Sequence, residues 1–428
     1  MKVRLPYHKT FLDVDIPDEN FLGVLSSKAD KYKPSLSQEE IVKAALDNPI
    51  GSPHLEELVK GKKEVLIITS DHTRPVPSKI TMPILLDTIR RANPDIDIKI
   101  MIATGFHRPT TKEEMINKFG EEIVKKETII NHMAFDKDQL EYVGVLPSGG
   151  KLYLNKMVCK SELVISEGFI EPHFFAGFSG GRKSILPGVA GATSVMENHC
   201  AKFIASPYAR TGNLENNPIH EDMLFAAKAA NLAFILNVVI DKDKKIINAF
   251  SGDSVLAHEE GCKFVKQLSS VKAKPADIVI STNGGYPLDQ NLYQSVKGMT
   301  AAEAACRENG VIIMVAACND GHGGESFYNN MKNAKSPREI LDRLVKVPPE
   351  DTAPDQWEFQ ILSRILDKHT VIFVTDMCDP KMIEDCHMIH AYTVEDAIKQ
   401  ALKLKGNDAK ITVIPDGVSV IVENDENI

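Results

Sequence analysis

Cysteine is scarce in this chain, with seven residues in 428 and no Cys-x-x-Cys pair. A sparse, odd-numbered set is typical of reduced thiols rather than of a disulfide framework, so we expect a cytoplasmic protein. Basic residues are not in excess either, because 50 lysines and arginines stand against 59 aspartates and glutamates, for a formal charge of −9. No positive surplus is therefore available to bind nucleic-acid phosphates or an anionic membrane surface.

Long apolar runs are also missing. The longest, such as residues 311–318, fall far short of the roughly 20 residues that cross a bilayer. The first residues carry two positive charges without an apolar segment behind them, so we expect no signal peptide. With 43% hydrophobic and 25% charged residues, the composition predicts a folded globular protein. Its length exceeds the ~250–300 residues at which single cores stop growing, which predicts two domains.

Short β-branched runs alternate with amphipathic segments over most of the chain, which is the pattern of parallel sheets covered by helices. The predicted strands are continuous apolar runs, as expected for strands buried on both faces; they are residues 64–69, 96–103, 162–166, 233–240, 277–281, 311–317, 370–375 and 411–414. Alternation up to Asp15 also predicts an N-terminal antiparallel hairpin. The sequence therefore predicts an α/β protein of two domains, each with a mainly parallel sheet covered by helices, and an active-site cleft between them.

The predicted boundary lies in the polar stretch 269–275, which ends in proline and precedes a new strand. We accordingly assign an N-terminal domain to residues 1–270 and a C-terminal domain to residues 271–428, with the final strand as a candidate to return to the first domain. In open α/β sheets, ligands bind beyond the carboxyl ends of the strands. The loops that follow strands here are rich in charge, histidine and glycine; they are residues 70–75, 104–109, 171–184, 282–290 and 319–325. We expect these loops to bind the ligand.

Two histidines, His107 and His173, stand out in these loops. Each lies a few residues beyond a predicted strand, with apolar neighbours and an arginine nearby. Either one alone could be a structural or a surface histidine. Two imidazoles that titrate near neutral pH can act as acid and base on opposite faces of a substrate, as a stereochemical inversion requires.

The glycine-rich segment 177–184 allows several interpretations. Gly177-x-Ser179-x-Gly181 matches a serine-hydrolase nucleophile elbow, but that elbow follows its strand directly and this segment does not. A Walker A loop needs Gly-Lys adjacent, whereas Arg182 separates Gly181 from Lys183. Glycine amides with a nearby cation could instead hold a phosphorylated cofactor. A tight loop with a solvated Arg-Lys pair is the remaining alternative.

Four further residues are weaker candidates. His199, followed by a cysteine, is a poor metal signal by itself, because protein metal sites usually collect three or four ligands. Arg74 and Lys297 are candidates for a carboxylate clamp. The single tryptophan, Trp357, belongs more often to a core than to a site.

Taken together, the motifs resemble the nickel-dependent lactate racemase family nearly from end to end. The resemblance is carried by residues 71–75 (Asp-His-Thr-Arg-Pro), 105–109 (Gly-Phe-His-Arg-Pro), 171–184, 197–199 (Glu-Asn-His) and 284–298. Each segment is weakly specific, the combination is specific, and no matched position departs from the family pattern.

This resemblance implies an isomerase that interconverts D- and L-lactate by proton-coupled hydride transfer through pyruvate. It implies the family's cofactor, the Ni(II)-pyridinium-3,5-bisthiocarboxylic acid mononucleotide (nickel pincer), joined to Lys183 through a thioamide, with His199 as a nickel ligand. Residues of the glycine-rich loop would lie near this cofactor: Gly177, Ser179, Gly180 and Arg182. Other proteins synthesise the cofactor, so a recombinant chain can lack it.

The resemblance also implies that His107 and His173 are the two acid/base residues, one for each enantiomer. Arg74 and Lys297 would orient the substrate. The rest of the implied substrate shell is Gln294, Tyr293, Trp357 and Asp71. Asp71 would orient a histidine or an arginine. Alternatives to lactate racemisation are racemisation or epimerisation of another 2-hydroxy acid with the same cofactor, a serine hydrolase that uses Ser179, and a nickel- or nucleotide-binding carrier.

Overall fold

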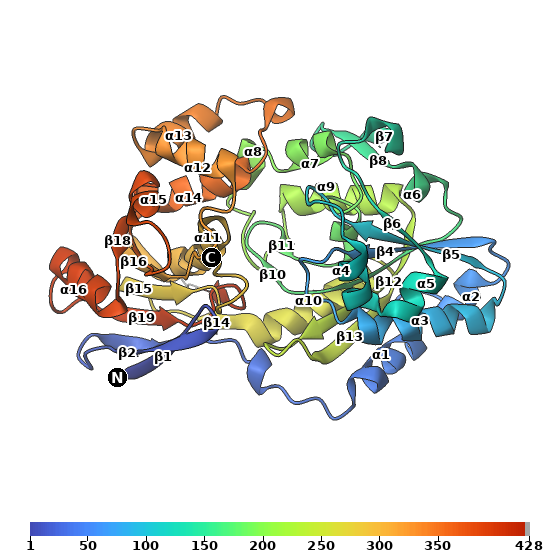
Figure 1. Cartoon of the computed structure of the whole chain (residues 1–428), viewed down its shortest axis with the longest axis horizontal. Coiled ribbons are helices and arrows are strands. Elements are labelled where there is room, and N and C mark those ends of the chain that lie inside the picture. The colour runs from blue at the N-terminus through green and yellow to red at the C-terminus, as the bar shows by residue number, and fades with distance from the viewer. Residues whose placement is uncertain (424–428) are drawn as a thin grey trace. The chain divides into compact units, whose positions relative to one another are not determined.

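Two six-stranded sheets organise the chain (Figure 1). A computed structural model describes residues 1–423, so residues 424–428 of the predicted C-terminal domain lie outside the described part. Each sheet belongs to one of two units. The first unit comprises Lys28–Asn198 and Ser206–Leu268, and the second comprises Met1–Ser27, His199–Ala205 and the chain from Ser269 onward.

The sheet of the first unit has the strand order β13-β12-β9-β4-β5-β6. Its strands are β4 (Glu64–Ser70), β5 (Asp97–Ala103), β6 (Thr128–Asn131), β9 (Val164–Phe169), β12 (Leu232–Ile240) and β13 (Ile246–Gly252). All neighbours are parallel except β12 and β13. Ile67 of β4 and Ile100 of β5 are fully buried, as their continuous apolar runs predict, and pack in one core with Leu85 of α3 (Ser78–Ala92).

The remaining elements of the first unit cover this sheet or carry its loops. They are α1 (Gln38–Asp47), α2 (Leu55–Val59), α4 (Lys112–Phe119), α5 (Glu121–Lys126), β7 (Leu140–Val145), β8 (Lys151–Asn155), α6 (Lys156–Lys160), β10 (Pro172–His173), β11 (Gly177–Phe178), α7 (Ala192–Asn198), α9 (Pro218–Ala229) and α10 (Leu256–Ser269). Residues 171–184, the richest of the predicted loops, follow β9 near the centre of the sheet.

The sheet of the second unit has the order β18-β17-β16-β15-β19-β3 and is parallel throughout. Its strands are β3 (Phe21–Val24), β15 (Ala276–Thr282), β16 (Cys306–Val315), β17 (Thr370–Val374), β18 (Ile389–Ala391) and β19 (Ile411–Ile414). The other elements are β1 (Lys2–Tyr7), β2 (Thr10–Asp15), α8 (Ala201–Ile204), β14 (Ser270–Lys272), α11 (Leu292–Ala305), α12 (Glu325–Lys332), α13 (Pro337–Leu344), α14 (Gln356–Lys368), α15 (Pro380–Asp385), α16 (Val394–Lys405) and β20 (Ile421–Glu423).

All eight predicted strands are present, and the predicted N-terminal hairpin is the antiparallel pair β1–β2. The α/β class with mainly parallel sheets is confirmed. Sequence analysis missed short edge strands such as β3 and β18, because three or four residues carry little periodicity. Residues 1–27 lie in the second unit, where Leu5 and Val14 join its core. β20 pairs with β14 in that same unit, and the domain division at residues 270 and 271 stays a prediction.

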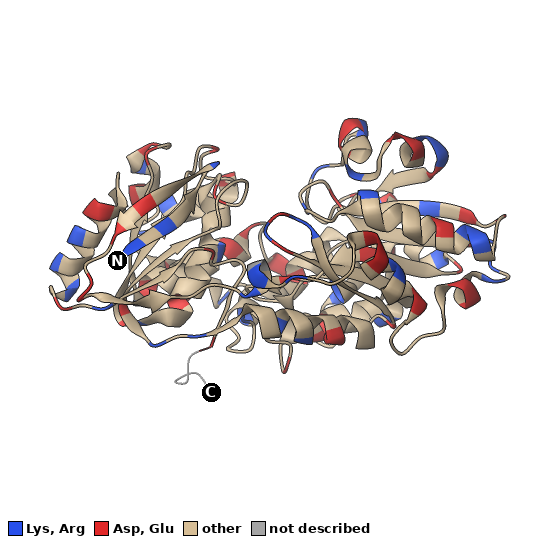
Figure 2. Cartoon of the chain, turned by 90° about the horizontal axis from the view of Figure 1, so that it is seen from below, with Lys and Arg blue, Asp and Glu red and all other residues tan. Residues whose placement is uncertain are grey.

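Acidic and basic residues are interspersed over both units (Figure 2). Between residues 1 and 423, no helix combines the length and the apolar character that a bilayer span needs.

Candidate active site

Asp71 and His107 meet at one edge of the first sheet. Asp71 follows β4 directly and His107 lies shortly after the adjacent strand β5, and because the two strands are parallel their carboxyl ends lie at the same edge. Oδ2 of Asp71 lies 2.5 Å from Nδ1 of His107. The aspartate side chain is only 2% exposed, whereas the imidazole is 45% exposed. Asp71 therefore orients the imidazole from its buried side, through Nδ1, and leaves Nε2 as the ring nitrogen available for proton transfer.

The second oxygen of Asp71 is bound by Thr73. The Thr73 amide donates to Oδ1 at 3.0 Å and its hydroxyl donates to the same oxygen at 2.6 Å. Burial raises the pKa of Asp71, but the hydrogen bond and charge of His107, the Thr73 hydroxyl and the charge of Arg74 outweigh it and lower the pKa to about 2. The carboxylate is thus ionised at neutral pH.

Thr73 links three predicted site residues, although sequence analysis did not single it out. Besides Asp71, its hydroxyl accepts from Nη1 of Arg74 at 3.0 Å and lies 3.4 Å from Nδ1 of His107. Arg74 itself is exposed. The only signal for Thr73 in the sequence was its position inside the Asp-His-Thr-Arg-Pro segment.

His173 and Lys183 meet in the loop that follows β9. His173 ends the two-residue strand β10, which pairs with β11. Its Nδ1 accepts from the amide of Ala176 at 3.3 Å, and its Nε2 lies 3.2 Å from Nζ of Lys183. The ring stacks on Phe174 and meets the edge of Phe175, over whose ring the lysine ammonium also lies. The second histidine and the predicted tether thus contact each other and share the aromatic neighbour Phe175.

Ser179 uses its hydroxyl inside the loop. The hydroxyl donates to the carbonyl of Phe169 at 3.1 Å and accepts from the amide of Glu171 at 2.9 Å. The nearest histidine contact is to the backbone, where Nε2 of His258 lies 2.8 Å from the carbonyl of Ser179. A nucleophilic serine needs a base on its hydroxyl, and this arrangement supplies none within residues 1–423. The geometry does not favour the hydrolase alternative.

The glycines of this loop are required by close packing. Gly177 and Gly180 have φ values of +78° and +77°, in the left-handed region. A Cβ on Gly177 would lie 2.3 Å from the carbonyl oxygen of Asn213, and one on Gly180 would lie 2.8 Å from that of Phe169. Protein atoms therefore fill the space that the missing side chains leave.

Arg182 is fully buried beneath the loop, in the 3-10 turn Gly181–Ser184. Its guanidinium donates to the carbonyls of Ala176 at 2.7 Å and Phe178 at 2.8 Å, and its Nε donates to Nδ1 of His220 at 3.0 Å. Burial, with the charge of Arg182, lowers the pKa of His220 to about 3, so this ring is a neutral acceptor. The guanidinium holds the backbone of the loop rather than standing in solvent beside Lys183, which corrects the solvated Arg-Lys alternative.

In the second unit, α11 carries three of the predicted substrate residues. Asn291 begins the helix by accepting from the amide of Gln294 at 2.9 Å. The side chain of Gln294 in turn accepts from Nζ of Lys297 at 2.6 Å, one helical turn further on. The hydroxyl of Tyr293 accepts from Nε1 of Trp357, on α14, at 3.1 Å.

Trp357 also meets His199. The two ring centroids lie 5.1 Å apart with an edge-to-face orientation, and His199 is only 4% exposed. Gln360, one turn along α14 from Trp357, donates to the carbonyl of Ala201 at 2.8 Å and so holds α14 against the segment that carries His199. A buried imidazole in an aromatic setting is suited to act as a single metal ligand. Among residues 1–423, no group of three or more His, Cys, Asp or Glu side chains is placed to bind a metal ion by itself.

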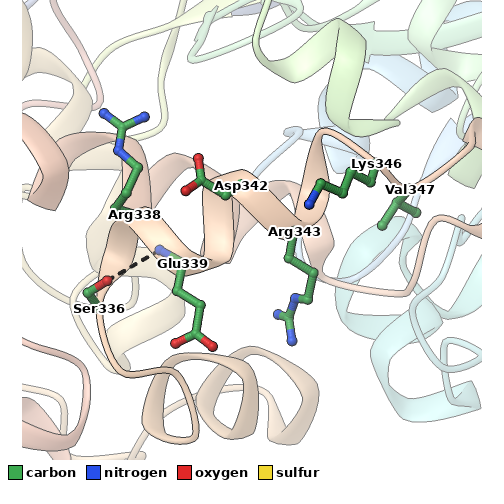
Figure 3. Close-up of a pocket in the computed structure, with 7 residues that line it drawn as sticks. All are labelled: Ser336, Arg338, Glu339, Asp342, Arg343, Lys346 and Val347. Atoms are coloured by element: carbon green, nitrogen blue, oxygen red, sulfur yellow. Dashed lines mark hydrogen bonds between the residues drawn. The ribbon is translucent and has the colours of Figure 1, made fainter.

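A hollow of about 550 Å³ lies elsewhere, along α13 (Figure 3). It is lined by Ser336, Arg338, Glu339, Asp342, Arg343, Lys346 and Val347. Arg338 is already paired with Asp367, and Arg343 donates to Asn330 at 2.7 Å. No predicted site residue lines this hollow, so it is not a candidate for the catalytic centre.

Comparison with known proteins places these residues in a family. Residues 7–212 match the lactate racemase N-terminal domain and residues 271–422 match the lactate racemase C-terminal domain. The lactate racemase of Thermoanaerobacterium thermosaccharolyticum is 57% identical over 420 residues, and that of Lactiplantibacillus plantarum is 56% identical over 421 residues. Both alignments cover 98% of this chain and 99% of the relative.

Solved structures agree with this relationship. The lactate racemase apoprotein of Thermoanaerobacterium thermosaccharolyticum superposes with a TM-score of 0.96 at 56% identity, over 99% of this chain and 100% of that one. A Thermotoga maritima protein has a TM-score of 0.69 at 18% identity, over 92% of this chain and 99% of its own, and this likeness concerns the fold alone.

Proposed function

Because this chain belongs to the lactate racemase family and is therefore an isomerase, we propose that it interconverts D- and L-lactate by proton-coupled hydride transfer through pyruvate. The observation that best supports this proposal is the orientation of the two histidines. His107 is held through Nδ1 by Asp71, which leaves its Nε2 for proton transfer. His173 is held through Nδ1 by a backbone amide, and its Nε2 lies 3.2 Å from Nζ of Lys183, the proposed site of cofactor attachment.

The two histidines would move the hydroxyl proton of the substrate. The α-hydrogen of lactate is next to a carboxylate and is weakly acidic, so its removal as a proton is unfavourable. In the proposal one imidazole takes the hydroxyl proton of lactate while the α-carbon becomes planar. The other imidazole would give a proton to the same oxygen once hydrogen has returned to the opposite face of that carbon. The ionised Asp71 holds His107 through Nδ1, so the ring is oriented for transfer of the proton at Nε2.

The chemistry of the donor set fits the cofactor that the resemblance implies. Lys183 offers a primary amine for covalent attachment, beside His173, and His199 offers a buried imidazole, which is a suitable ligand for Ni(II). When bound, the nickel pincer would supply an acceptor for the α-hydrogen as hydride. Other proteins would be needed to make and load it. The compartment we propose is the cytoplasm, because the seven cysteines, all within residues 1–423, form no disulfide.

We propose that the glycine-rich loop fixes the backbone from which the Lys183 side chain extends. Its four residues, Gly177, Ser179, Gly180 and Arg182, would lie near the cofactor, and their hydrogen bonds and close contacts fix the backbone there. A single rigid loop would thus set the positions of both Lys183 and His173.

Arg74 and Lys297 would bind the substrate carboxylate and oxygens. A guanidinium can pair with both oxygens of a carboxylate, whereas an ammonium acts as a point charge. Gln294 holds the Lys297 ammonium, and Tyr293 holds Trp357, so both would support the substrate shell. Another 2-hydroxy acid would bind to the same groups. The preference between such acids would depend on the size of the substituent on the substrate that the site accepts.

Racemisation of α-deuterated L-lactate in ordinary water tests the proposal. Enzyme from a host that makes the cofactor should form D-lactate with the deuterium kept at carbon, because hydride does not exchange with solvent. Extensive loss of deuterium would refute hydride transfer. No turnover of lactate, with turnover of a larger 2-hydroxy acid, would favour the alternative substrate.

A further inference from the structure

Glu167 is a buried carboxylate of the first unit that the proposed function leaves unused. It lies on β9, beside Thr69 of the parallel strand β4, and only 1% of it is exposed. Its Oε2 accepts from the hydroxyl of Thr69 at 2.5 Å. Its Oε1 accepts from the hydroxyls of Ser78 at 2.8 Å and Thr81 at 2.5 Å. Three hydroxyls from other elements therefore compensate the burial of this group.

The three hydroxyls lie at the two ends of one loop. Thr69 is the next-to-last residue of β4, and Ser78 and Thr81 belong to the first turn of α3. The loop between these elements, residues 71–77, carries the aspartate that binds His107 and the arginine that is proposed to bind the substrate. A single carboxylate thus holds both the strand from which this loop leaves and the helix to which it leads.

Helix α3 also has no anion of its own at its start. Pro77, directly before the helix, has no hydrogen-bonding group in its side chain, and the first turn, residues 78–81, contains no acidic residue. The N-terminus of a helix carries a partial positive charge, which a nearby anion stabilises. Glu167 reaches this end of α3 from the neighbouring strand, through its hydrogen bonds to the first turn.

The strand that carries Glu167 leads to the other loop of the candidate active site. β9 ends at Phe169, and the loop with His173 and Lys183 follows it. We propose that Glu167 is a positioning residue, which fixes the loop of Asp71 against the strand that leads to His173. The inference rests on the proposed function, because it assigns Glu167 an effect on the two histidines and not a contact with the substrate.

The test compares Glu167→Ala and Glu167→Gln with a matched control, Glu127→Gln. Glu127 is also buried and also holds α3, but at the opposite end of this 15-residue helix, where Arg90 donates to its two oxygens at 2.7 and 2.9 Å. Each variant is made in a host that produces the cofactor. Both kcat and KM for L-lactate are then expressed per nickel-loaded chain, at a temperature at which circular dichroism shows every variant folded.

Glu167→Ala should lower kcat per loaded chain by up to about 100-fold, because a displacement of about 1 Å at reacting groups can cost that much. It should also raise KM, since Arg74 belongs to the same loop. Glu167→Gln keeps one acceptor oxygen, and the hydroxyls can turn to accept from its NH₂ group, so it should restore part of the loss. Glu127→Gln should lower Tm and leave kcat and KM unchanged.

Two further measurements separate positioning from stability. In an Asp71→Asn background, Glu167→Ala should cost little additional turnover, because residues that act as one unit are not additive. Hydrogen exchange of the apoprotein, followed by mass spectrometry, gives a result without turnover. Peptides that cover residues 71–77 should exchange faster in Glu167→Ala than in Glu127→Gln. If Glu167→Ala does not fold, Thr81→Val takes its place, because it removes one of the three donors at nearly constant shape.

Two results would overturn the inference. One is a Glu167→Ala enzyme whose kcat and KM per loaded chain equal those of the control, which would leave Glu167 a purely structural role. The other is equal exchange of residues 71–77 in this variant and in the unaltered apoprotein. Loaded, unaltered enzyme that fails to racemise lactate would instead refute the proposed function, whereas the exchange comparison would still decide whether Glu167 holds the loop.

Discussion

Asp71→Asn would remove one charge from the candidate site with little change in shape. Both carboxylate oxygens of Asp71 accept hydrogen bonds, Oδ1 from the amide and hydroxyl of Thr73 and Oδ2 from Nδ1 of His107. Asparagine has only one acceptor oxygen. Its NH₂ group must therefore face either the donors of Thr73 or the Nδ1–H of His107, and one of these contacts becomes a clash of two donors.

The cost in stability can be worked from the pKa of Asp71. The pKa falls from 3.8 to about 2 on folding, which corresponds to about 2 kcal/mol for this buried group. A lowered carboxyl pKa stabilises the protein above 3.8, and the contribution disappears as the pH falls to about 2. Chemical unfolding at pH 7 should therefore show Asp71→Asn less stable by about 2 kcal/mol, with the difference narrowing below pH 3.8.

Turnover should fall by roughly 10²–10⁴, because His107 loses the anion that orients it. A double-mutant cycle with His107→Ala measures whether the aspartate acts through the histidine, since residues that act as one unit are not additive. We expect Asp71→Asn to cost almost nothing in turnover once His107 is alanine. The control, Glu114→Gln, breaks the exposed pair with Arg108 next to His107 and should leave turnover within about twofold. Equal losses from Asp71→Asn in both backgrounds would refute the coupling.

Three other substitutions separate the proposed roles. Lys183→Ala, made in a host that produces the cofactor, should lack the additional mass that the unaltered peptide carries; unmodified Lys183 in fully active enzyme would exclude the tether. His199→Ala should lose nickel by metal analysis with only a modest change in Tm, and full nickel content with full activity would remove His199 from the site. Ser179→Ala should keep substantial turnover and lose roughly 1–3 kcal/mol in chemical unfolding, because the Phe169 carbonyl and the Glu171 amide lose their partner. Near-total loss of turnover in Ser179→Ala, with cofactor still bound, would restore a chemical role for this serine.

The strands were predictable because burial on both faces leaves a local trace in the sequence. Continuous apolar runs marked β4, β5 and β12 without any knowledge of their partners. The same logic predicts ligand binding at the loops that follow these strands, since loops at the carboxyl ends of parallel strands gather at one edge. Edge strands such as β18 left no such trace, because three residues cannot show a period.

The pairing of site residues was only partly predictable. Sequence analysis chose Asp71, His107, His173 and Lys183 as candidates, but the hydrogen bond between Asp71 and His107 depends on the adjacency of β4 and β5. Lys183 lies ten positions after His173, and only the turn through β10 and β11 brings the two side chains together.

The sequence by itself determined the α/β class, the strands and the loops that are candidates for the active site, because each of these depends on residue type and local periodicity. Tertiary structure alone decided which loop residues bind one another and which are buried. Arg182 shows the reason: its sequence context suggests a solvated cation, yet backbone carbonyls and a neutral histidine accept its hydrogen bonds and make full burial possible. Likewise, residues 1–27 join the second core because Leu5 and Val14 find their partners about 270 or more residues later in the chain, at a separation that no local pattern records.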